Sequence, residues 1–276
     1  MTENPFFKRV YNSHTPEEIM AVYDDWADEY DETVLAHGYV TPKRCADALA
    51  SLEDDRSARL LDIGCGTGIS GMALRSAGFT TIDGSEVNAR MLEKARSRQG
   101  IYSAMHLVSL DNPFDFAIGT YRHMTAMGVI ATGHAPASTI RAILAKLEAG
   151  GLLVFSLNDH TLEFAEYPDT VDAVVAENIA ELAFDEYGDH MPMIGLNSRI
   201  IALKTDEKEI QHLGKGQRDH DEIKPACAER KKPDHQPQHP CQAKGDQRMQ
   251  PAAVDTVKLA DPHRVGTQPD KGSMPE

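Results

Sequence analysis

Residues 60–68, with the sequence LLDIGCGTG, constrain the fold more than any other part of the chain. A largely apolar run over residues 58–63 is stopped by glycines at every second position from Gly64 onward. Such a run predicts a buried strand that ends in a tight turn, because glycine adopts backbone conformations that other residues avoid. Residues 69–77 then have helical spacing and stop at Gly78, a typical helix terminator.

Strand and helix signals alternate along the rest of the first 204 residues. Apolar runs predict further strands at residues 79–82, 103–110, 121–130, 152–157 and 198–203. Helical spacing predicts helices at residues 88–97, 137–148 and 170–184. This alternation predicts a doubly wound α/β sheet, mostly parallel. An antiparallel last strand is also expected.

Two helices are expected before the first strand. Thr15 and Glu18 form a capping box, and Pro16 occupies the first helical position. The side chains that follow at spacings of four, three and four form one apolar, aromatic face: Ile19, Tyr23, Trp26 and Tyr30. The Thr-Pro pair at residues 41–42 begins the second helix.

The composition changes abruptly after residue 204. Residues 205–276 contain no aromatic side chain and only seven Ile, Leu or Val, but eight prolines and 25 charged residues. Such a segment cannot bury enough apolar surface to offset the entropy of ordering it. We therefore expect one folded domain over residues 1–204 and a disordered tail over residues 205–276. A cysteine and histidine group in the tail fits no standard zinc spacing, so no metal site is predicted: Cys227, His235, His239 and Cys241.

The folded part is strongly acidic, with 16 basic and 30 acidic residues before position 205. An acidic surface repels phosphate backbones, so we expect no nucleic-acid partner. No run approaches the roughly 20 apolar residues of a membrane span. The first nine residues lack the features of a signal peptide, and four cysteines do not make a disulfide scaffold. We expect a cytoplasmic protein without a membrane partner, whose oligomeric state the sequence does not define.

The glycine turn and an acid beyond it predict a cofactor site. Ligands of doubly wound sheets bind at the carboxyl ends of the strands, where this turn lies. Glu86 stands 22 residues beyond Gly64, directly after the second expected strand. An acid at that place accepts hydrogen bonds from both hydroxyls of a ribose.

Two cofactor classes compete for this turn, beside a third interpretation in which it binds nothing. Residues 66–71 satisfy the dinucleotide pattern, in which a helix N-terminus holds a pyrophosphate. The other frame begins with Asp62, whose carboxylate opposes a pyrophosphate but suits a cation. S-adenosylmethionine (SAM) carries a sulfonium, an ammonium and a ribose but no phosphate, so charge favours SAM.

Residues 60–68 resemble motif I of the class I, Rossmann-like SAM-dependent methyltransferases, and Glu86 falls where their ribose-binding acid stands. Residues 23–31 (YDDWADEYD) resemble the "YD-x-WA-x-x-YD" start of many bacterial members. Within the class, residues 20–204 are most similar to the Williams–Beuren-region methyltransferase-like proteins. Short sequence motifs support that similarity: GY at 38–39, GHAP at 133–136 and GGLLVFS at 150–156.

The resemblance implies a role for each matching residue. Asp62 would hold the amino group of the methionine moiety, directly or through water, and the turn would line that moiety through Gly64, Cys65, Gly66 and Gly68. Glu86, followed by Val87, would bind the ribose. The acid that often contacts adenine is missing here, and Ser109 and Leu110 occupy its place. Tyr23, Trp26 and Tyr30 either pack a helix or close over the methionine end, as in the family. We interpret Cys65 as small buried filler and not as a nucleophile.

Methyl transfer from a sulfonium is an in-line displacement that needs alignment more than acid–base help. A base is required only when the acceptor must lose a proton. His134 and His160 follow the fourth and fifth principal strands and titrate near neutral pH, so they are the candidate bases. The simpler interpretation of both is a loop histidine bonded to backbone or solvent.

These observations predict a SAM-dependent methyltransferase with a small-molecule acceptor of unknown identity. A SAM-binding protein without catalysis and an NAD(P)-dependent oxidoreductase are the alternatives. Release of S-adenosylhomocysteine (SAH) distinguishes the first alternative, and stabilisation by NAD(P) the second.

We predict that a chain cut after residue 204 keeps nearly the melting temperature of the full chain, because the removed segment carries no apolar pattern that could pack. Calorimetric melting of both chains tests this. A drop of many degrees would show that the segment packs on the domain.

Overall fold

The computed structural model describes residues 5–13 and 15–206. Apart from residues 205 and 206, the predicted tail lies outside the described residues. The cysteine and histidine group of the tail lies outside them as well: Cys227, His235, His239 and Cys241.

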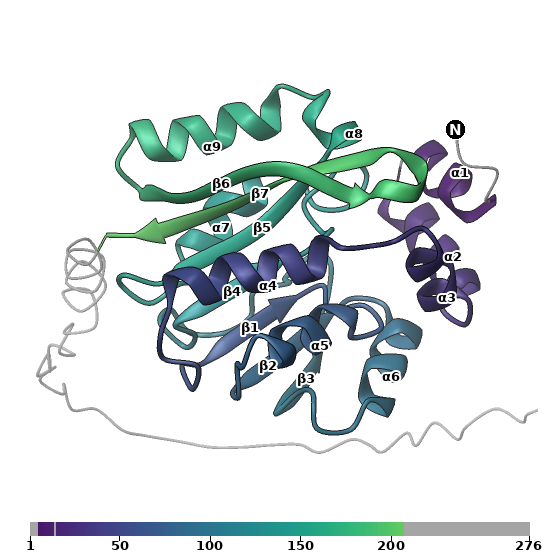
Figure 1. Cartoon of the computed structure of the whole chain (residues 1–276), viewed down its shortest axis with the longest axis horizontal. Coiled ribbons are helices and arrows are strands. Elements are labelled where there is room, and N and C mark those ends of the chain that lie inside the picture. The colour runs from purple at the N-terminus through teal and green to yellow at the C-terminus, as the bar shows by residue number, and fades with distance from the viewer. Residues whose placement is uncertain (1–4, 14, 207–276) are drawn as a thin grey trace, which may run out of the picture. The chain divides into compact units, whose positions relative to one another are not determined.

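Helices and strands alternate as expected in most of the described part (Figure 1). The helices are α1 (Pro5–Asn12), α2 (Pro16–Trp26), α3 (Tyr30–Ala36), α4 (Thr41–Leu52), α5 (Ile69–Ser76), α6 (Ala89–Ser97), α7 (Ser138–Leu144), α8 (Asp159–Leu162), α9 (Glu166–Ala176) and the 3₁₀ turn η1 (Pro192–Ile194). The strands are β1 (Leu60–Ile63), β2 (Ile82–Glu86), β3 (Ala104–Leu107), β4 (His123–Ala126), β5 (Leu152–Asn158), β6 (Ala180–Met191) and β7 (Leu196–Thr205). None of the described helices combines the length and the hydropathy that a membrane crossing requires.

The strands form one sheet in the order β3-β2-β1-β4-β5-β7-β6. The first five strands are parallel, and β7 runs antiparallel to β5, which confirms the predicted fold class and the antiparallel last strand. The order reverses between β1 and β4, so the crevice at the carboxyl ends of these strands is the expected ligand position. The glycine turn follows β1 at this point.

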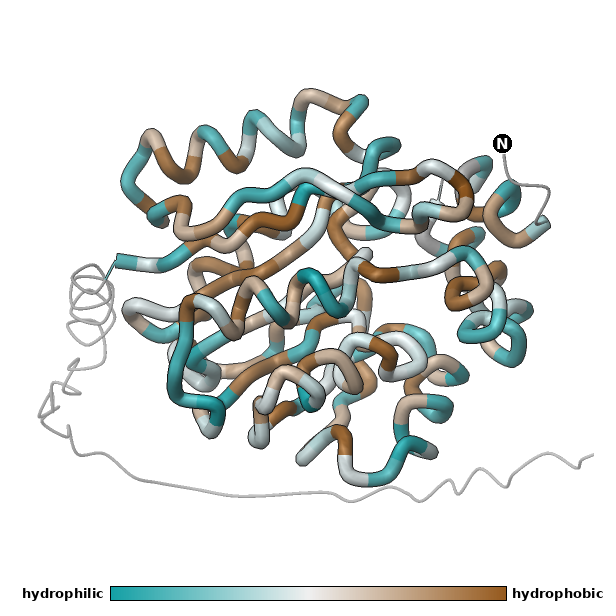
Figure 2. The backbone as a smooth tube through the Cα atoms, in the orientation of Figure 1, coloured by the Kyte–Doolittle hydropathy of each residue, from teal (hydrophilic) through white to brown (hydrophobic). Residues whose placement is uncertain are grey.

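Consecutive residues of the central strands supply the two cores of the domain. Leu60 and Leu152 belong to a buried cluster that includes Leu49 of α4 and Leu74 of α5. Their neighbours Leu61 and Leu153 belong to a second cluster, which includes Ile140 of α7 and Val171 of α9. Alternating side chains point to opposite faces of a strand, so a strand buried on both faces must be largely apolar. Figure 2 shows hydrophobic colour over much of the central strands, with interruptions, and β1 and β4 do contain polar residues such as Asp62 and His123.

The capping box at the start of α2 forms as predicted. The Thr15 hydroxyl accepts a hydrogen bond from the Glu18 N–H, and the Glu18 carboxylate accepts one from the Thr15 N–H. The expectation of one helix through Tyr30 is wrong, because α2 ends at Trp26 and α3 begins at Tyr30. The indole N–H of Trp26 donates to Thr33 (3.2 Å), which holds α3 back against α2.

The predicted helix over residues 170–184 is wrong in its second half. The helix α9 stops at Ala176, Asn178 adopts a left-handed conformation (φ 57°), and the chain continues as β6. Most side chains of β6 are exposed or half-buried, so this edge strand has no clear apolar alternation in its sequence. Backbone pairing with β7 defines it instead. Asn is a common terminator in the left-handed conformation, and it was the available signal.

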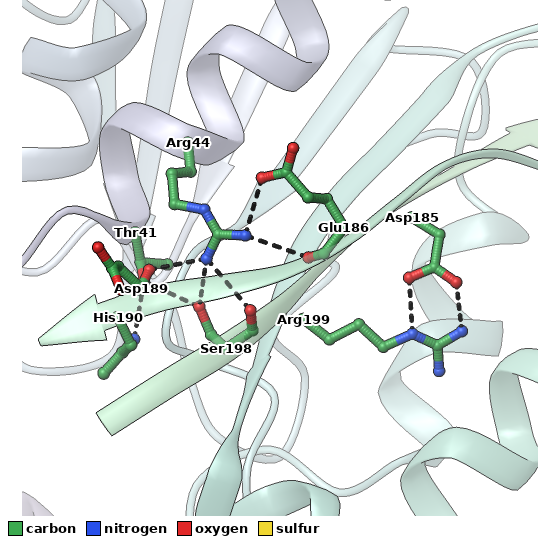
Figure 3. A network of polar contacts seen from close by, with 8 residues as sticks. All are labelled: Thr41, Arg44, Asp185, Glu186, Asp189, His190, Ser198 and Arg199. Carbon is green, nitrogen blue, oxygen red and sulfur yellow. Dashed lines mark hydrogen bonds and ion pairs between the residues drawn. The ribbon is translucent and has the colours of Figure 1, made fainter. Parts of the chain in front are cut away.

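A polar network attaches the β6–β7 hairpin to α4 (Figure 3). The guanidinium of Arg44 donates to the carbonyl oxygens of Glu186, Asp189 and Ser198, at 2.7 to 3.1 Å, and pairs with the Glu186 carboxylate. Beside it, the buried Thr41 hydroxyl lies 2.7 Å from Nδ1 of His190. Burial lowers the pKa of His190 to about 4, so its ring is neutral at neutral pH. The Arg44 guanidinium therefore binds carbonyl oxygens of both β6 and β7.

We predict that Arg44→Met lowers the free energy of unfolding by about 2–4 kcal/mol, because several hydrogen bonds from a largely buried charge are lost. Arg141→Met serves as the control, since Arg141 forms an exposed pair with Glu177 and should cost under about 1 kcal/mol. Denaturant unfolding measures both. Equal losses in the two variants would contradict a role for Arg44 in holding the hairpin.

Candidate functional site

A cavity of about 340 Å³ lies at the carboxyl ends of the parallel strands. The residues that line it come from α2, α3, the turns after β1 to β4, and the start of α7. Those predicted from the sequence to belong to a site are Tyr23, Tyr30, Gly64, Gly66, Glu86, Val87, Leu110 and His134. The remaining lining residues are largely apolar and include Ile19, Val108, Pro113, Phe114, Met127, Val129 and Thr139.

The glycine turn has the backbone conformation that its sequence predicts. Gly64, Gly66 and Gly68 all have positive φ, at 61°, 54° and 92°. A side chain at Gly64 would also lack space, because its Cβ would lie 2.5 Å from Cγ2 of Val129. Glycine at position 64 therefore lets Val129 approach the turn closely, and no side chain from this position fills the cavity.

Glu86 closes one wall of the cavity and holds two turns together. Its Oε2 accepts a hydrogen bond from the Gly66 N–H (2.9 Å), and its Oε1 accepts from the N–H groups of Val87 and Asn88 (both 2.9 Å). Burial raises the pKa of Glu86 above its ordinary value, although the three N–H groups oppose the shift. A carboxylate has about four acceptor positions, so at least one remains for a ligand hydroxyl.

Asp62 lies beneath the turn and is not among the lining residues. Its carboxylate accepts hydrogen bonds from the hydroxyls of Ser70 (2.5 Å), Tyr102 (2.8 Å) and Thr125 (3.0 Å). Burial raises the pKa of Asp62 to about 6, against the effect of these three donors. The residue is fully buried, so it acts on the cavity through its charge or through an intervening group and not by direct contact.

Two further residues of the turn, Cys65 and Gly68, also face away from the cavity. Cys65 packs with Leu92 and Ala95 of α6, and burial raises the pKa of its thiol. A buried thiol with a raised pKa is a poor nucleophile, as expected from the sequence. Gly68 is the N-terminal cap residue of α5.

The segment after β3 forms the far end of the cavity. Leu110 lines it, whereas Ser109 is exposed and lines a separate hollow beside β3. Phe114 and Pro113 lie in the lining as well, although no sequence motif marks them. Their apolar character in an irregular segment directly after the third strand was the available signal.

The aromatic face of the N-terminal helices divides into two parts. Tyr23 and Tyr30 line the cavity. Trp26 is 2% exposed and stacks on Phe6 of α1, with ring centroids 5.2 Å apart, so it belongs to a core that α1 shares with residues 16–36, which we call the lid segment. The packing of α1 explains this division, because the rings of Phe6 and Phe7 contact that of Trp26.

Tyr23 and His134 form a pair across the cavity mouth. The Tyr23 hydroxyl lies 2.9 Å from Nε2 of His134, and Nδ1 of His134 lies 3.4 Å from the carbonyl oxygen of Thr132. Burial lowers the pKa of His134, so the neutral ring is favoured at neutral pH. With its proton on Nδ1, the ring accepts the Tyr23 hydroxyl at Nε2.

His160 does not join this pair. It is exposed in α8, after β5, and is not among the residues that line the cavity. The loop after β4 contributes most of the opposite wall instead, through Met127, Gly128 and Val129. The Ser156 hydroxyl accepts a hydrogen bond from the Gly128 N–H (2.9 Å), which fixes this loop to β5.

The residues of the cavity fit an adenosyl sulfonium compound better than a dinucleotide. Glu86 is buried and lines the cavity, and the Asp62 carboxylate lies beneath the glycine turn. Within the described residues, no Lys or Arg side chain lines the cavity, so no side-chain cation there would pair with a pyrophosphate. The negative charges of Glu86 and Asp62 both favour the binding of a cation.

The family model described as a methyltransferase domain matches residues 37–213. Methyltransferase-like protein 27 of Homo sapiens is 31% identical over 149 residues, which make up 52% of this chain and 60% of that protein. An uncharacterized protein of a Synechococcus species is 28% identical over 150 residues, or 52% of this chain and 34% of that one. The chain thus aligns with less than two thirds of either relative.

Solved structures share the fold at low sequence identity. A chain of the complex between the Haloferax volcanii Trm112 methyltransferase activator and a methyltransferase has a TM-score of 0.53 and 15% identity, and covers 68% of this chain and 97% of its own. A TehB-like SAM-dependent methyltransferase from Corynebacterium glutamicum has a TM-score of 0.50 and 15% identity, over 67% and 99%. The chain belongs to the methyltransferase-domain family, and its cofactor is SAM.

Proposed function

We propose that the protein transfers a methyl group from SAM to a small-molecule acceptor bound in the cavity. The observation that carries the proposal is the single cavity that joins Glu86 and the glycine turn to the Tyr23–His134 pair. A cofactor-binding end and a potential acceptor end therefore share one open cavity. Bound SAM would supply an activated methyl group on a positively charged sulfur.

The residues of the turns would hold and orient the cofactor. Glu86 would accept a hydrogen bond from a ribose hydroxyl, and Gly64 and Gly66 would allow the backbone to approach the methionine end. The Asp62 charge would favour the cationic groups from beneath the turn. Leu110 and Phe114 offer an apolar surface to the adenine.

The acceptor would enter between the lid segment and the loop after β4. Ile19, Met127 and Val129 make this region apolar, which favours an acceptor with an apolar body. Nε2 of His134 lies within hydrogen-bond distance of the Tyr23 hydroxyl, so the pair can take up a proton if the acceptor must lose one. This assigns His134, and not His160, as the base.

The remaining parts of the proposal concern the setting of the protein. The acidic composition supports an acceptor other than a nucleic acid. The free, buried thiols of Cys45 and Cys65 support a cytoplasmic location. A SAM-binding protein without catalysis stays the alternative, and the turnover assay below separates the two.

We predict that Glu86→Ala weakens SAH binding by about 1–3 kcal/mol, since a ribose hydroxyl and three backbone N–H groups lose their acceptor. Titration calorimetry measures this. In parallel, the wild type should release SAH from SAM with a member of an acceptor panel of phenols, thiols and amines with apolar bodies, and Glu86→Ala should need far more SAM.

Glu177→Ala is the matched control, because Glu177 is exposed and pairs only with the surface residue Arg141 among the contacts described. It should bind SAH as the wild type does. Equal affinity of Glu86→Ala and Glu177→Ala for SAH would exclude Glu86 from the cofactor site. Tight SAM binding with no SAH release on any acceptor would favour the non-catalytic alternative.

We predict that SAM affinity increases as the pH rises from 5 to 7. Asp62 has a pKa of about 6, so it is largely protonated at pH 5 and ionised at pH 7. The cationic cofactor is attracted only by the ionised form, which gives the sign of the dependence. Calorimetry at a series of pH values, with Asp62→Asn as the comparison, measures it. An Asp62→Asn variant with an undiminished pH dependence would show that another group is responsible.

A further inference from the structure

The acids of the N-terminal YD segment have partners that the proposed function does not use. Asp24 lies in α2, Asp28 in the turn after it and Asp31 in α3. Their partners lie on α6, on the residues that cap it, or on the glycine turn after β1. The tyrosines of the segment line the cavity, whereas these acids lie beside it.

Asp31 holds the glycine turn from outside. Its Oδ1 accepts a hydrogen bond from the Thr67 hydroxyl (2.5 Å), and its Oδ2 pairs with the Arg98 guanidinium. Nε of Arg98 in turn donates to the carbonyl oxygen of Thr67 (2.6 Å). The hydroxyl and the carbonyl group of Thr67 are therefore both held, and Thr67 is bonded directly to Gly66, whose N–H donates to Glu86.

Asp24 holds the second turn in the same way. Its Oδ1 accepts a hydrogen bond from the side-chain amide of Asn88 (2.8 Å). The backbone N–H of Asn88 donates to Oε1 of Glu86 (2.9 Å), and its Oδ1 caps α6 by accepting from the Met91 N–H. Each acid thus reaches Glu86 through one intervening turn, on opposite sides of the carboxylate.

Asp28 lies between these two acids but has a different kind of partner. It pairs with Arg90 (3.1 Å) and Lys94 (2.6 Å), both of which are exposed or half-buried side chains of α6. The Asp28 side chain is 62% exposed, and exposed pairs contribute little to stability. It joins the lid segment to α6 without holding either turn, so it provides an internal control.

We propose that Asp24 and Asp31 are positioning residues for the cofactor site: from the lid segment they fix the two turns whose N–H groups orient the Glu86 carboxylate. The proposal rests on the function proposed above, in which Glu86 binds the ribose. Docking of the lid segment and shaping of the ribose site then become one event. If the lid segment moved away from the sheet, the hydrogen bonds from Thr67 to Asp31 and from Asn88 to Asp24 would be lost together.

The affinity of the purified full chain for SAH tests this inference by titration calorimetry. Asp31→Ala and Asp24→Ala should each weaken SAH binding about tenfold, because loss of a charged hydrogen bond loosens one turn beside Glu86. Asp28→Ala should change it less than twofold. Equal losses in Asp28→Ala and Asp31→Ala would overturn the inference, because they would indicate only general attachment of the lid segment.

A double-variant cycle separates positioning from a general structural effect. In a Glu86→Ala background, Asp31→Ala should weaken SAH binding no further, since the carboxylate that it orients is gone. Losses that add in the double variant would overturn the inference. Thr67→Val provides a second route if Asp31→Ala does not fold, because it removes only the hydroxyl that Asp31 binds, and it should also bind SAH about tenfold more weakly.

SAH binding by the wild type distinguishes failure of the proposed function from failure of the positioning role alone. A wild-type chain that does not bind SAH at all would contradict the proposed function itself. A wild type that binds SAH, with Asp31→Ala and Thr67→Val of unchanged affinity, would leave that function standing and remove the positioning role.

Discussion

The rest of the site depends on the hydrogen bonds that the Glu86 carboxylate accepts. They come from backbone N–H groups of the glycine turn and of the turn that starts α6. These two turns follow adjacent strands of the sheet. One buried acid therefore sets the distance between two loops and also faces the cavity between them. The parallel pairing of β1 with β2 makes this possible, because it places both turns at the same edge of the sheet.

Burial of two acids near one another has an electrostatic consequence. Removal from water raises the pKa values of both Asp62 and Glu86, and the charge of Glu86 contributes to the shift at Asp62. Hydroxyl and N–H donors stabilise the ionised forms only in part. A cation bound beside them relieves the remaining cost, so the same arrangement that is unfavourable in the free protein favours a sulfonium and an ammonium over a phosphate.

The sequence predicted the parts of the molecule that local patterns determine. The glycine turn, Glu86, the capping box at Thr15 and the antiparallel last strand are all found, because each depends on neighbouring residues or on a strongly apolar run. Membership of the methyltransferase family followed from the same short stretch, and the family match confirms it.

Features that depend on tertiary contacts were not predictable in this way. Trp26 has the same helical spacing as Tyr23, and only the packing of α1 against it separates a core residue from a lining residue. The strand β6 is defined by its pairing with β7, so its own sequence resembles the end of a helix. Asp31 meets Thr67 across 36 positions of the chain, a distance that no local pattern covers.

A crystal structure of the protein with SAH tests the central claim most directly. The account predicts electron density for the nucleoside in the cavity, with a ribose hydroxyl within hydrogen-bond distance of the Glu86 carboxylate and the sulfur on the side of Tyr23. Density for SAH at any other place, or a ribose that leaves Glu86 without contact, would contradict it.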